Sequence, residues 1–187
     1  MNKIRTFLSL NINNTLREKV SQYQQKIKNI LSEYNIKWES PEKFHMTLRF
    51  LGDINEKDVE NLIKDLDNIL YDFPKLLFLP DTIDVFPNKR KPNVIFFGLK
   101  GEEINSGILT DEIDKVILKY GIIPDKKFVP HITIGRFRRE NRIGVSDITF
   151  PEIDPMNFEF DRFYLMKSVM DFRGSKYFVI KDFLFNK

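Results

Sequence analysis

The 187-residue chain contains only two histidines, and both stand in the same local pattern. His45-Met46-Thr47-Leu48 and His131-Ile132-Thr133-Ile134 each read histidine, apolar residue, threonine, apolar residue. In a β-strand residues i and i+2 point to the same face, so each histidine shares a face with its threonine. An imidazole titrates near pH 6.5, so one ring can serve as a base while the other serves as an acid. If the two strands meet at a cleft, this pair suits in-line displacement at phosphorus, with the hydroxyls holding non-bridging oxygens.

Either histidine alone would more often be a hydrogen-bonded core residue, and the repetition of the whole pattern favours a catalytic pair. Two arginines follow the motifs. Arg136 lies five residues after His131, so it reaches the site only at a β-bulge or beyond the strand end. Arg49 lies four residues after His45 and shares its parity, which predicts either a rim contact with substrate or a salt bridge at the rim. The aromatic candidates for stacking on a base are Phe7, Trp38, Phe86 and Phe137.

The elements that must position these residues alternate between periods of two and 3.6. Strands are predicted at 3–10, 44–51, 93–99, 128–137, 157–168 and 176–185, the last two joined by a turn at 171–174. Three helices are predicted. The first covers 15–34, the second follows an N-cap at Asn55 and has an apolar stripe over 59–70, and the third covers 108–120 and ends at Gly121. The basic stretch between Pro87 and Pro92 is either a lobe boundary or a long hairpin loop.

Composition excludes several classes of protein. The absence of cysteine removes disulfides, thiol nucleophiles and cysteine zinc sites, and two histidines are too few for a zinc centre built mainly from histidine. No metal and no cofactor are therefore expected. Hydrophobic residues make up 42% and charged residues 30%, and no apolar run approaches the ~20 residues that span a bilayer. We expect a cytoplasmic protein with no membrane contact, and a monomer, because no apolar helix is left unpartnered.

Net charge gives little indication of partners. The balance of 30 basic and 27 acidic residues leaves +3, too little to indicate nucleic acid. Local basic clusters are more suggestive, and lean toward polynucleotide ends, although a solvated surface would explain them as well. They are Lys89-Arg90-Lys91, Lys126-Lys127, and Arg136, Arg138, Arg139 and Arg142.

The two motifs, extended to His45–Gly52 and Pro130–Arg136, resemble the signatures of the two-histidine (2H) phosphoesterases. The most similar branch is that of the RNA 2′,3′-cyclic phosphodiesterases, also named 2′-5′ RNA ligases. Weaker similarity to that branch extends over Arg5–Leu10, Phe86–Leu99, Phe163–Ser168 and Gly174–Tyr177. The resemblance implies an α+β fold: one domain over 1–187, with two pseudo-symmetric lobes. Each lobe would be an antiparallel sheet with helices on the outside, and the active cleft would lie between them.

The resemblance also implies the roles of the site residues. His45 and His131 would be catalytic, and Thr47, Thr133 and Arg136 would bind the substrate phosphate. Hydrolysis of a 2′,3′-cyclic phosphate to a 2′-phosphate would use His131 as the base on water and His45 as the acid on the leaving 3′ oxygen. Arg49 and Phe7 are candidates for base or rim contacts. The substrates would be RNA ends or small cyclic nucleotides, with weak 2′-5′ ligation as the reverse reaction.

Two other interpretations stay open at this point. The chain could be a nucleotide-binding sensor or scaffold that keeps the pocket without rapid turnover. It could also be a phosphodiesterase of the same fold that acts on 2′-5′ oligoadenylate or on ADP-ribose cyclic phosphate. The sequence does not separate these substrates from RNA ends.

Overall fold

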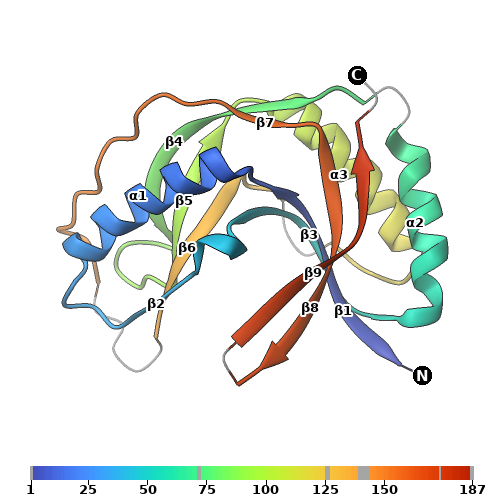
Figure 1. Cartoon of the computed structure of the whole chain (residues 1–187), viewed down its shortest axis with the longest axis horizontal. Helices are drawn as coiled ribbons and strands as arrows, with labels where there is room; N and C mark the ends of the chain where they lie inside the picture. Colours follow the sequence, from blue (N-terminus) through green and yellow to red (C-terminus); the bar gives the residue numbers. More distant parts are fainter. Residues whose placement is uncertain (1, 71–72, 125–126, 139–143, 173, 186–187) are drawn as a thin grey trace.

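The computed structural model describes residues 2–70, 73–124, 127–138, 144–172 and 174–185. Strands and helices alternate along the chain, and its last two strands form a hairpin (Figure 1). The elements are β1 (Lys3–Asn11), α1 (Asn14–Ile30), β2 (Ile36–Trp38), η1 (Pro41–Lys43), β3 (His45–Asn55), η2 (Glu56–Asp58), α2 (Val59–Asp67), η3 (Asn68–Leu70), β4 (Leu76–Phe86), β5 (Val94–Lys100), α3 (Glu103–Leu118), β6 (His131–Phe137), β7 (Phe158–Phe160), β8 (Arg162–Asp171) and β9 (Gly174–Leu184).

The strands form one curled antiparallel sheet in the order β7-β4-β5-β6-β3-β1-β8-β9, with β2 added beside β6. Its two halves meet between β6 and β3, where the paired residues are Met46 and Ile132. We call β2, β4, β5, β6 and β7 the β6 sub-sheet, and β1, β3, β8 and β9 the β3 sub-sheet. The expected α+β fold with two antiparallel sheets is confirmed, and the narrow junction joins the two sheets into one.

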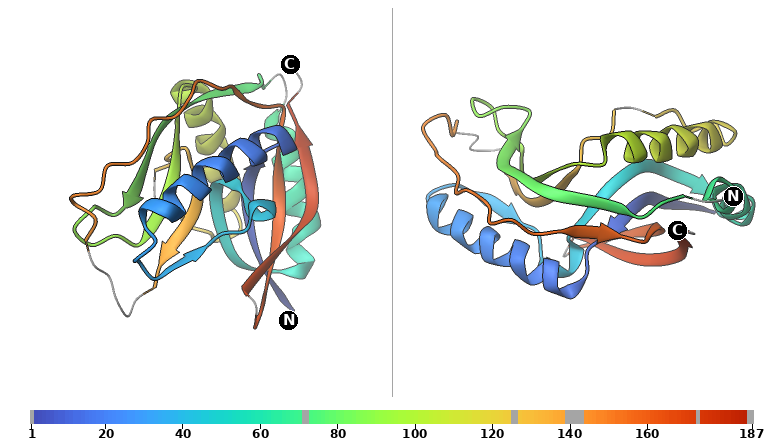
Figure 2. Two further views of the ribbon diagram at one scale, coloured as in Figure 1. Left: turned by 60° about the vertical axis from the view of Figure 1, so that its left-hand side comes forward. Right: turned by 90° about the horizontal axis from the view of Figure 1, so that it is seen from above.

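The helices cover the sub-sheets on different sides (Figure 2). Helix α1 packs on the β6 sub-sheet, where the ring of Tyr23 lies 5.8 Å from Phe97 of β5. Helix α3 packs on the β3 sub-sheet through an ion pair between Asp114 and Arg49. The apolar stripe expected in the first helix is buried at Leu16, Val20, Tyr23 and Ile27. Each sub-sheet therefore has a helix-covered face with the core, and an opposite face that is free to carry polar side chains.

Most predicted elements are present, with shifted ends. The first helix begins after the N-cap Asn13, whose side chain accepts a hydrogen bond from the Leu16 amide at 2.9 Å. Asn55 precedes the short 3₁₀ helix η2 and donates to Asp58 rather than capping α2, so the predicted cap is wrong by one turn. Gly121 lies shortly after the end of α3 and has a φ angle of +72°, a left-handed conformation that glycine adopts readily. Asp58, at the true N-cap of α2, makes no side-chain capping bond.

Two strands were not predicted. In β4 buried Leu76 and Phe78 alternate with exposed Leu77 and Leu79, but Pro80 follows at once and hides the pattern. Strand β2 has only three residues, too few for a periodicity. The segment between Pro87 and Pro92 is the loop of the β4–β5 hairpin, which resolves the alternative left open by the sequence.

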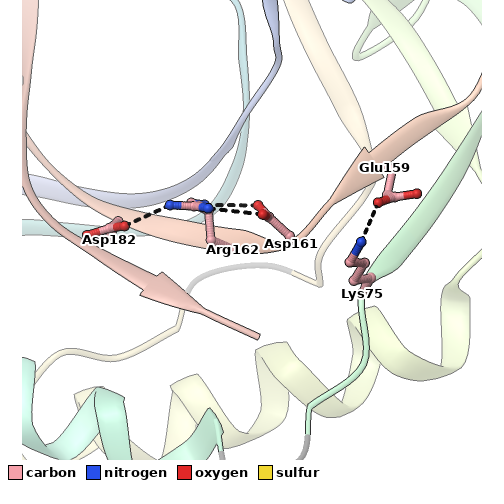
Figure 3. A network of polar contacts seen from close by, with 5 residues as sticks. All are labelled: Lys75, Glu159, Asp161, Arg162 and Asp182. Carbon is pink, nitrogen blue, oxygen red and sulfur yellow. Dashed lines mark hydrogen bonds and ion pairs between the residues drawn. The ribbon is translucent and has the colours of Figure 1, made fainter. Parts of the chain in front are cut away.

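The chain crosses from one sub-sheet to the other at Asp161, between β7 and β8. β7 pairs with β4 in the β6 sub-sheet, whereas β8 pairs with β1 and β9. Arg162 donates to Asp161 and to Asp182 of β9, and Lys75 pairs with Glu159 of β7 at 2.8 Å (Figure 3). The Arg162 guanidinium also lowers the pKa of Asp161. These ion pairs hold the crossover on both sub-sheets.

Candidate active site

The junction of the two sub-sheets brings the two histidine motifs side by side. His45 is the first residue of β3 and His131 is the first residue of β6, and the pair Met46–Ile132 joins these strands one residue further on. Met46 and Ile132 are fully buried, while the histidines are part-buried on the opposite face. Antiparallel strands place directly paired side chains on the same face. The face opposite the core is therefore the one that both imidazoles share, and we call it the cleft face.

Both imidazoles are held in the same tautomer. Nδ1 of His45 lies 2.6 Å from the carbonyl oxygen of Lys43, and Nδ1 of His131 lies 2.7 Å from that of Val129. A carbonyl oxygen only accepts hydrogen bonds, so each Nδ1 must carry a proton. Each Nε2 is then the atom that gains or loses a proton, and this is the atom available to a reactant.

Aromatic rings pack against each imidazole. The ring of His45 lies 5.1 Å from Phe7 and 5.4 Å from Tyr177. The ring of His131 lies 5.2 Å from Phe86 and 5.8 Å from Phe96, which stack on one another. Burial lowers the pKa of both histidines, because desolvation disfavours the imidazolium. The site therefore favours neutral rings until other charges act on them.

The threonines share the cleft face with the histidines. Thr47 Oγ1 lies 3.1 Å from Nε2 of His45. Thr47 is paired with Ser9 of β1, and Thr133 is paired with Phe96 of β5. Both threonines are part-buried on the cleft face, and Thr47 Oγ1 lies beside the atom of His45 that would exchange a proton, so these hydroxyls can donate to phosphate oxygens.

A β-bulge in β6 turns Arg136 onto the cleft face. The register to β5 passes from Phe96–Thr133 to Ile95–Gly135, so Ile134 has no partner of its own. The extra residue reverses the alternation, and burial follows it: Ile134 and Gly135 are both buried while Arg136 is exposed. Arg136 was expected to reach the site only at a β-bulge or beyond the strand end, and this bulge provides the first of these. Its Nε lies 3.6 Å from a carboxylate oxygen of Glu39.

A matching bulge in β3 turns Arg49 away from the cleft face, and of the two alternatives for Arg49 the structure favours the salt bridge over the contact with substrate. The register to β1 passes from Ser9–Thr47 to Leu8–Arg49, so Leu48 is the extra residue. Arg49 is 7% exposed and donates from Nε and Nη2 to both carboxylate oxygens of Asp114, at 2.6 and 2.8 Å. Strand parity failed here because the bulge lies between His45 and Arg49. The arginine serves the α3–β3 interface.

The same bulge turns Phe50 onto the cleft face. Phe50 is paired with Phe7 across β3 and β1, their rings are 6.2 Å apart, and Phe50 is 63% exposed. Phe7 is only 3% exposed and packs under His45, so the structure corrects its expected contact with a base. Sequence reasoning missed Phe50 because a regular strand would bury it. The +5 spacing that it shares with Arg136 was the available signal.

Tyr177 of β9 is the second residue that sequence reasoning missed. It is paired with Ser168 of β8, and it touches both Phe7 and His45. Burial raises the pKa of Tyr177, so its hydroxyl stays protonated and can donate. Nothing in the local sequence of a C-terminal hairpin indicates that it reaches a histidine more than a hundred residues earlier.

The remaining candidates fall in different places. Phe86 contacts His131, whereas Phe137 is buried against Tyr34, and Trp38 packs over Gly135 on the core side of β6. Lys126, Arg139 and Arg142 of the basic clusters lie outside the described residues. Within the described ranges, no group of three metal-ligating side chains is close enough to hold a metal ion. No helix among these residues is long and apolar enough to cross a membrane.

Two imidazoles and two hydroxyls on one face, with a guanidinium beside them, make up the donor and acceptor set of a phosphoester-cleaving acid–base site. Comparison with known proteins points to the same class. The family model described as LigT like Phosphoesterase matches residues 10–96. A relative from Methanothermobacter thermautotrophicus is 32% identical over 73% of this chain and 72% of its own length. One from Thermotoga maritima is 27% identical over 96% and 94%; both are named RNA 2′,3′-cyclic phosphodiesterase.

Solved structures show the same fold. Escherichia coli LigT complexed with 3′-AMP superposes with a TM-score of 0.81 over the whole of both chains, at 17% identity. A protein of Thermus thermophilus gives 0.78 over 97% of this chain and 98% of its own, at 21% identity. The chain belongs to the LigT-like phosphoesterase family.

Proposed function

We propose that this protein hydrolyses RNA ends that carry a 2′,3′-cyclic phosphate, leaving a 2′-phosphate. The observation that carries the proposal is the pair of imidazoles that both bind a backbone carbonyl through Nδ1 and so leave Nε2 for the reactant, with the Thr47 hydroxyl next to Nε2 of His45. The relatives named RNA 2′,3′-cyclic phosphodiesterase support this substrate. The whole chain acts as one catalytic unit, because its two motifs come from the two halves of the sheet.

The proposed reaction needs one base and one acid. Nε2 of His131 takes a proton from water as the water oxygen attacks phosphorus. The bond from phosphorus to O3′ breaks in line, and Nε2 of His45 gives its proton to O3′. Thr47, Thr133 and Arg136 bind the non-bridging oxygens, where negative charge increases in the transition state. His131 accepts the proton from water and His45 supplies the proton to O3′, so the proposal does not require a metal ion.

Phe50 and Arg136, which the two bulges turn onto the cleft face, orient the substrate in this proposal. Phe50 offers an exposed ring on which a base can stack. Arg136 offers a charge to the phosphate on the other side of the junction. In this proposal the base lies over Phe50 and the leaving O3′ lies at His45, since both residues belong to β3.

The test is hydrolysis of a short RNA with a 2′,3′-cyclic phosphate end in excess chelator, with the products resolved as 2′- or 3′-phosphate. We expect only 2′-phosphate from the wild type, and at least a 10²-fold loss in both His45→Ala and His131→Ala, since each proton transfer contributes on the order of 10²–10⁴-fold. Circular dichroism should show both variants folded. A 3′-phosphate product, or full activity in either variant, would overturn the proposed mechanism. Nucleotide binding without turnover would support a sensor instead.

A further inference from the structure

Arg5 is an exposed arginine on the cleft face of β1. It is paired with Ser168 of β8, and Ser168 is paired with Tyr177 of β9, whose ring touches His45. Directly paired residues of antiparallel strands point to the same face, so Arg5 shares a face with Tyr177. The register between β1 and β8 has no shift, and the alternation along β1 also puts Arg5 on the face of Phe7, which packs against His45. Both arguments place Arg5 on the face that carries the imidazoles.

No carboxylate of the described residues pairs with the Arg5 guanidinium. Arg49, Arg136 and Arg162 are all in ion pairs, whereas Arg5 is in none of the ion pairs or side-chain hydrogen bonds found in the described part of the chain. Asp53 of β3 is the residue opposite Arg5, and it is exposed as well. An unpaired guanidinium is suited to an anionic ligand, because its planar N–H donors match the oxygens of a phosphate.

The pairing between β1 and β3 gives the order of the groups along the cleft. Asn11 is opposite His45, and Phe7 is opposite Phe50. Arg5 lies two residues beyond Phe7, on the side away from His45, which is about 7 Å further along the strand. Diagonal neighbours on one face of a sheet lie about 7–8 Å apart, within reach of a long side chain. Arg5 can therefore reach a group bound next to the Phe50 ring.

An RNA end has a second anionic group at a fixed place relative to the first. Its terminal ribose carries the cyclic phosphate on O2′ and O3′, and it carries the phosphodiester to the preceding nucleotide on O5′. With O3′ at His45 and the base over Phe50, as proposed above, O5′ leaves the ribose on the side away from His45. The phosphodiester on O5′ is then directed along β1 toward Arg5. A free nucleoside 2′,3′-cyclic phosphate has no group in this position.

We infer that Arg5 binds the phosphodiester on O5′ of the terminal nucleotide, so that the protein distinguishes an RNA end from a free nucleoside 2′,3′-cyclic phosphate. The inference rests on the proposed function, which places the base and O3′. Arg136 and Arg5 then hold the two phosphates that flank the terminal ribose. Lys3 is exposed, has the same parity as Arg5 and is opposite Asn55, so positive charge continues outward along β1.

The experiment compares three substrates with the same terminal base. They are adenosine 2′,3′-cyclic phosphate, the same nucleotide with a 5′-phosphate, and an RNA dinucleotide of two adenosines that ends in a 2′,3′-cyclic phosphate. We expect kcat/KM of the wild type to be about ten- to a hundredfold higher on the two substrates that carry a phosphate on O5′, the range for a hydrogen bond to a charged group. In Arg5→Gln this preference should fall to near one.

Two further variants test whether charge at this position is the cause. Lys64→Gln removes a positive charge from an exposed residue of α2, which lies beside α3 and outside the cleft (Figure 1), and it should keep the wild-type preference. Asp53→Asn removes the carboxylate opposite Arg5 and should increase the preference, because like charges repel. A fall in the preference in Asp53→Asn would overturn the electrostatic basis of the inference.

Three other results would overturn the role of Arg5 and leave the proposed function standing. They are a wild type without the preference, an unchanged preference in Arg5→Gln, and a preference confined to the dinucleotide, which would indicate a contact with the second nucleoside. Circular dichroism should show the variants folded, because the substituted residues are exposed. Absence of wild-type turnover on all three substrates would refute the proposed function, and this inference with it.

Discussion

Phe50 and Arg136 occupy corresponding positions on the two sides of the cleft, each five residues beyond its motif histidine. A β-bulge at Leu48 turns Phe50 onto the cleft face, and a β-bulge at Ile134 does the same for Arg136. One position is an exposed aromatic ring and the other a guanidinium. Two similar motifs thus end in different chemistry, which supports the proposed placement of the base at Phe50 and of the phosphate at Arg136.

Phe50→Ala should raise KM for an RNA substrate by about ten- to a hundredfold, because stacking of one base contributes roughly 1–3 kcal/mol. The matched control is Phe178→Ala, a similarly exposed phenylalanine on the face of β9 opposite Tyr177. Steady-state kinetics on ribose 2′,3′-cyclic phosphate, which lacks a base, should show little difference between Phe50→Ala and wild type. An equal loss on both substrates would argue against stacking.

Arg49→Ala and Arg136→Ala should separate stability from activity. Arg49→Ala breaks a buried bidentate pair, so urea denaturation should show a loss of about 3–5 kcal/mol in the free energy of unfolding. Arg136→Ala breaks a half-exposed pair, which contributes about 0–1 kcal/mol, but removes a phosphate ligand and should lower kcat/KM at least tenfold. The reverse pattern would restore Arg49 as the substrate contact.

Tyr177→Phe should keep the ring against His45 and Phe7 while removing the hydroxyl. A hydrogen bond to a charged group contributes roughly 1.5–3 kcal/mol, so a hydroxyl that donates to the phosphate would cost about ten- to a hundredfold in kcat/KM when lost. Tyr177→Leu should also broaden the NMR signal of His45, because the His45 imidazole loses its contact with the Tyr177 ring and becomes more mobile. Wild-type kinetics in Tyr177→Phe would restrict the residue to packing.

Stability should fall as the pH is lowered below about 6.5, the value for an unfolded histidine. Burial lowers the pKa of His45 and His131, so the folded protein binds fewer protons than the unfolded chain in this range. The stability that these groups contribute is present above the unfolded pKa and is lost as the pH falls through the folded pKa. Urea midpoints at pH 8 and pH 5 should differ less in a His45→Gln, His131→Gln double variant than in the wild type.

Much of the local structure was predictable. The apolar stripe of α1 is carried by residues close together in the chain, and the structure buries it at Leu16, Val20, Tyr23 and Ile27. Strand β4 was missed because Pro80 interrupts its pattern, and β2 because it is too short. The cap predicted at Asn55 was displaced because that side chain donates to Asp58.

The two repeated motifs were sufficient to identify the pair of histidines, since residue type and spacing of two are preserved by any strand. The neighbours of those histidines were not predictable in this way. A bulge at one residue exchanges the faces of Arg49 and Phe50, and it depends on the register with β1. Glu39 and Tyr177 reach the site only because β2 pairs with β6 and β9 pairs with β8. Such contacts join residues far apart in the chain, so only the packed sheet brings their charges and rings to the cleft.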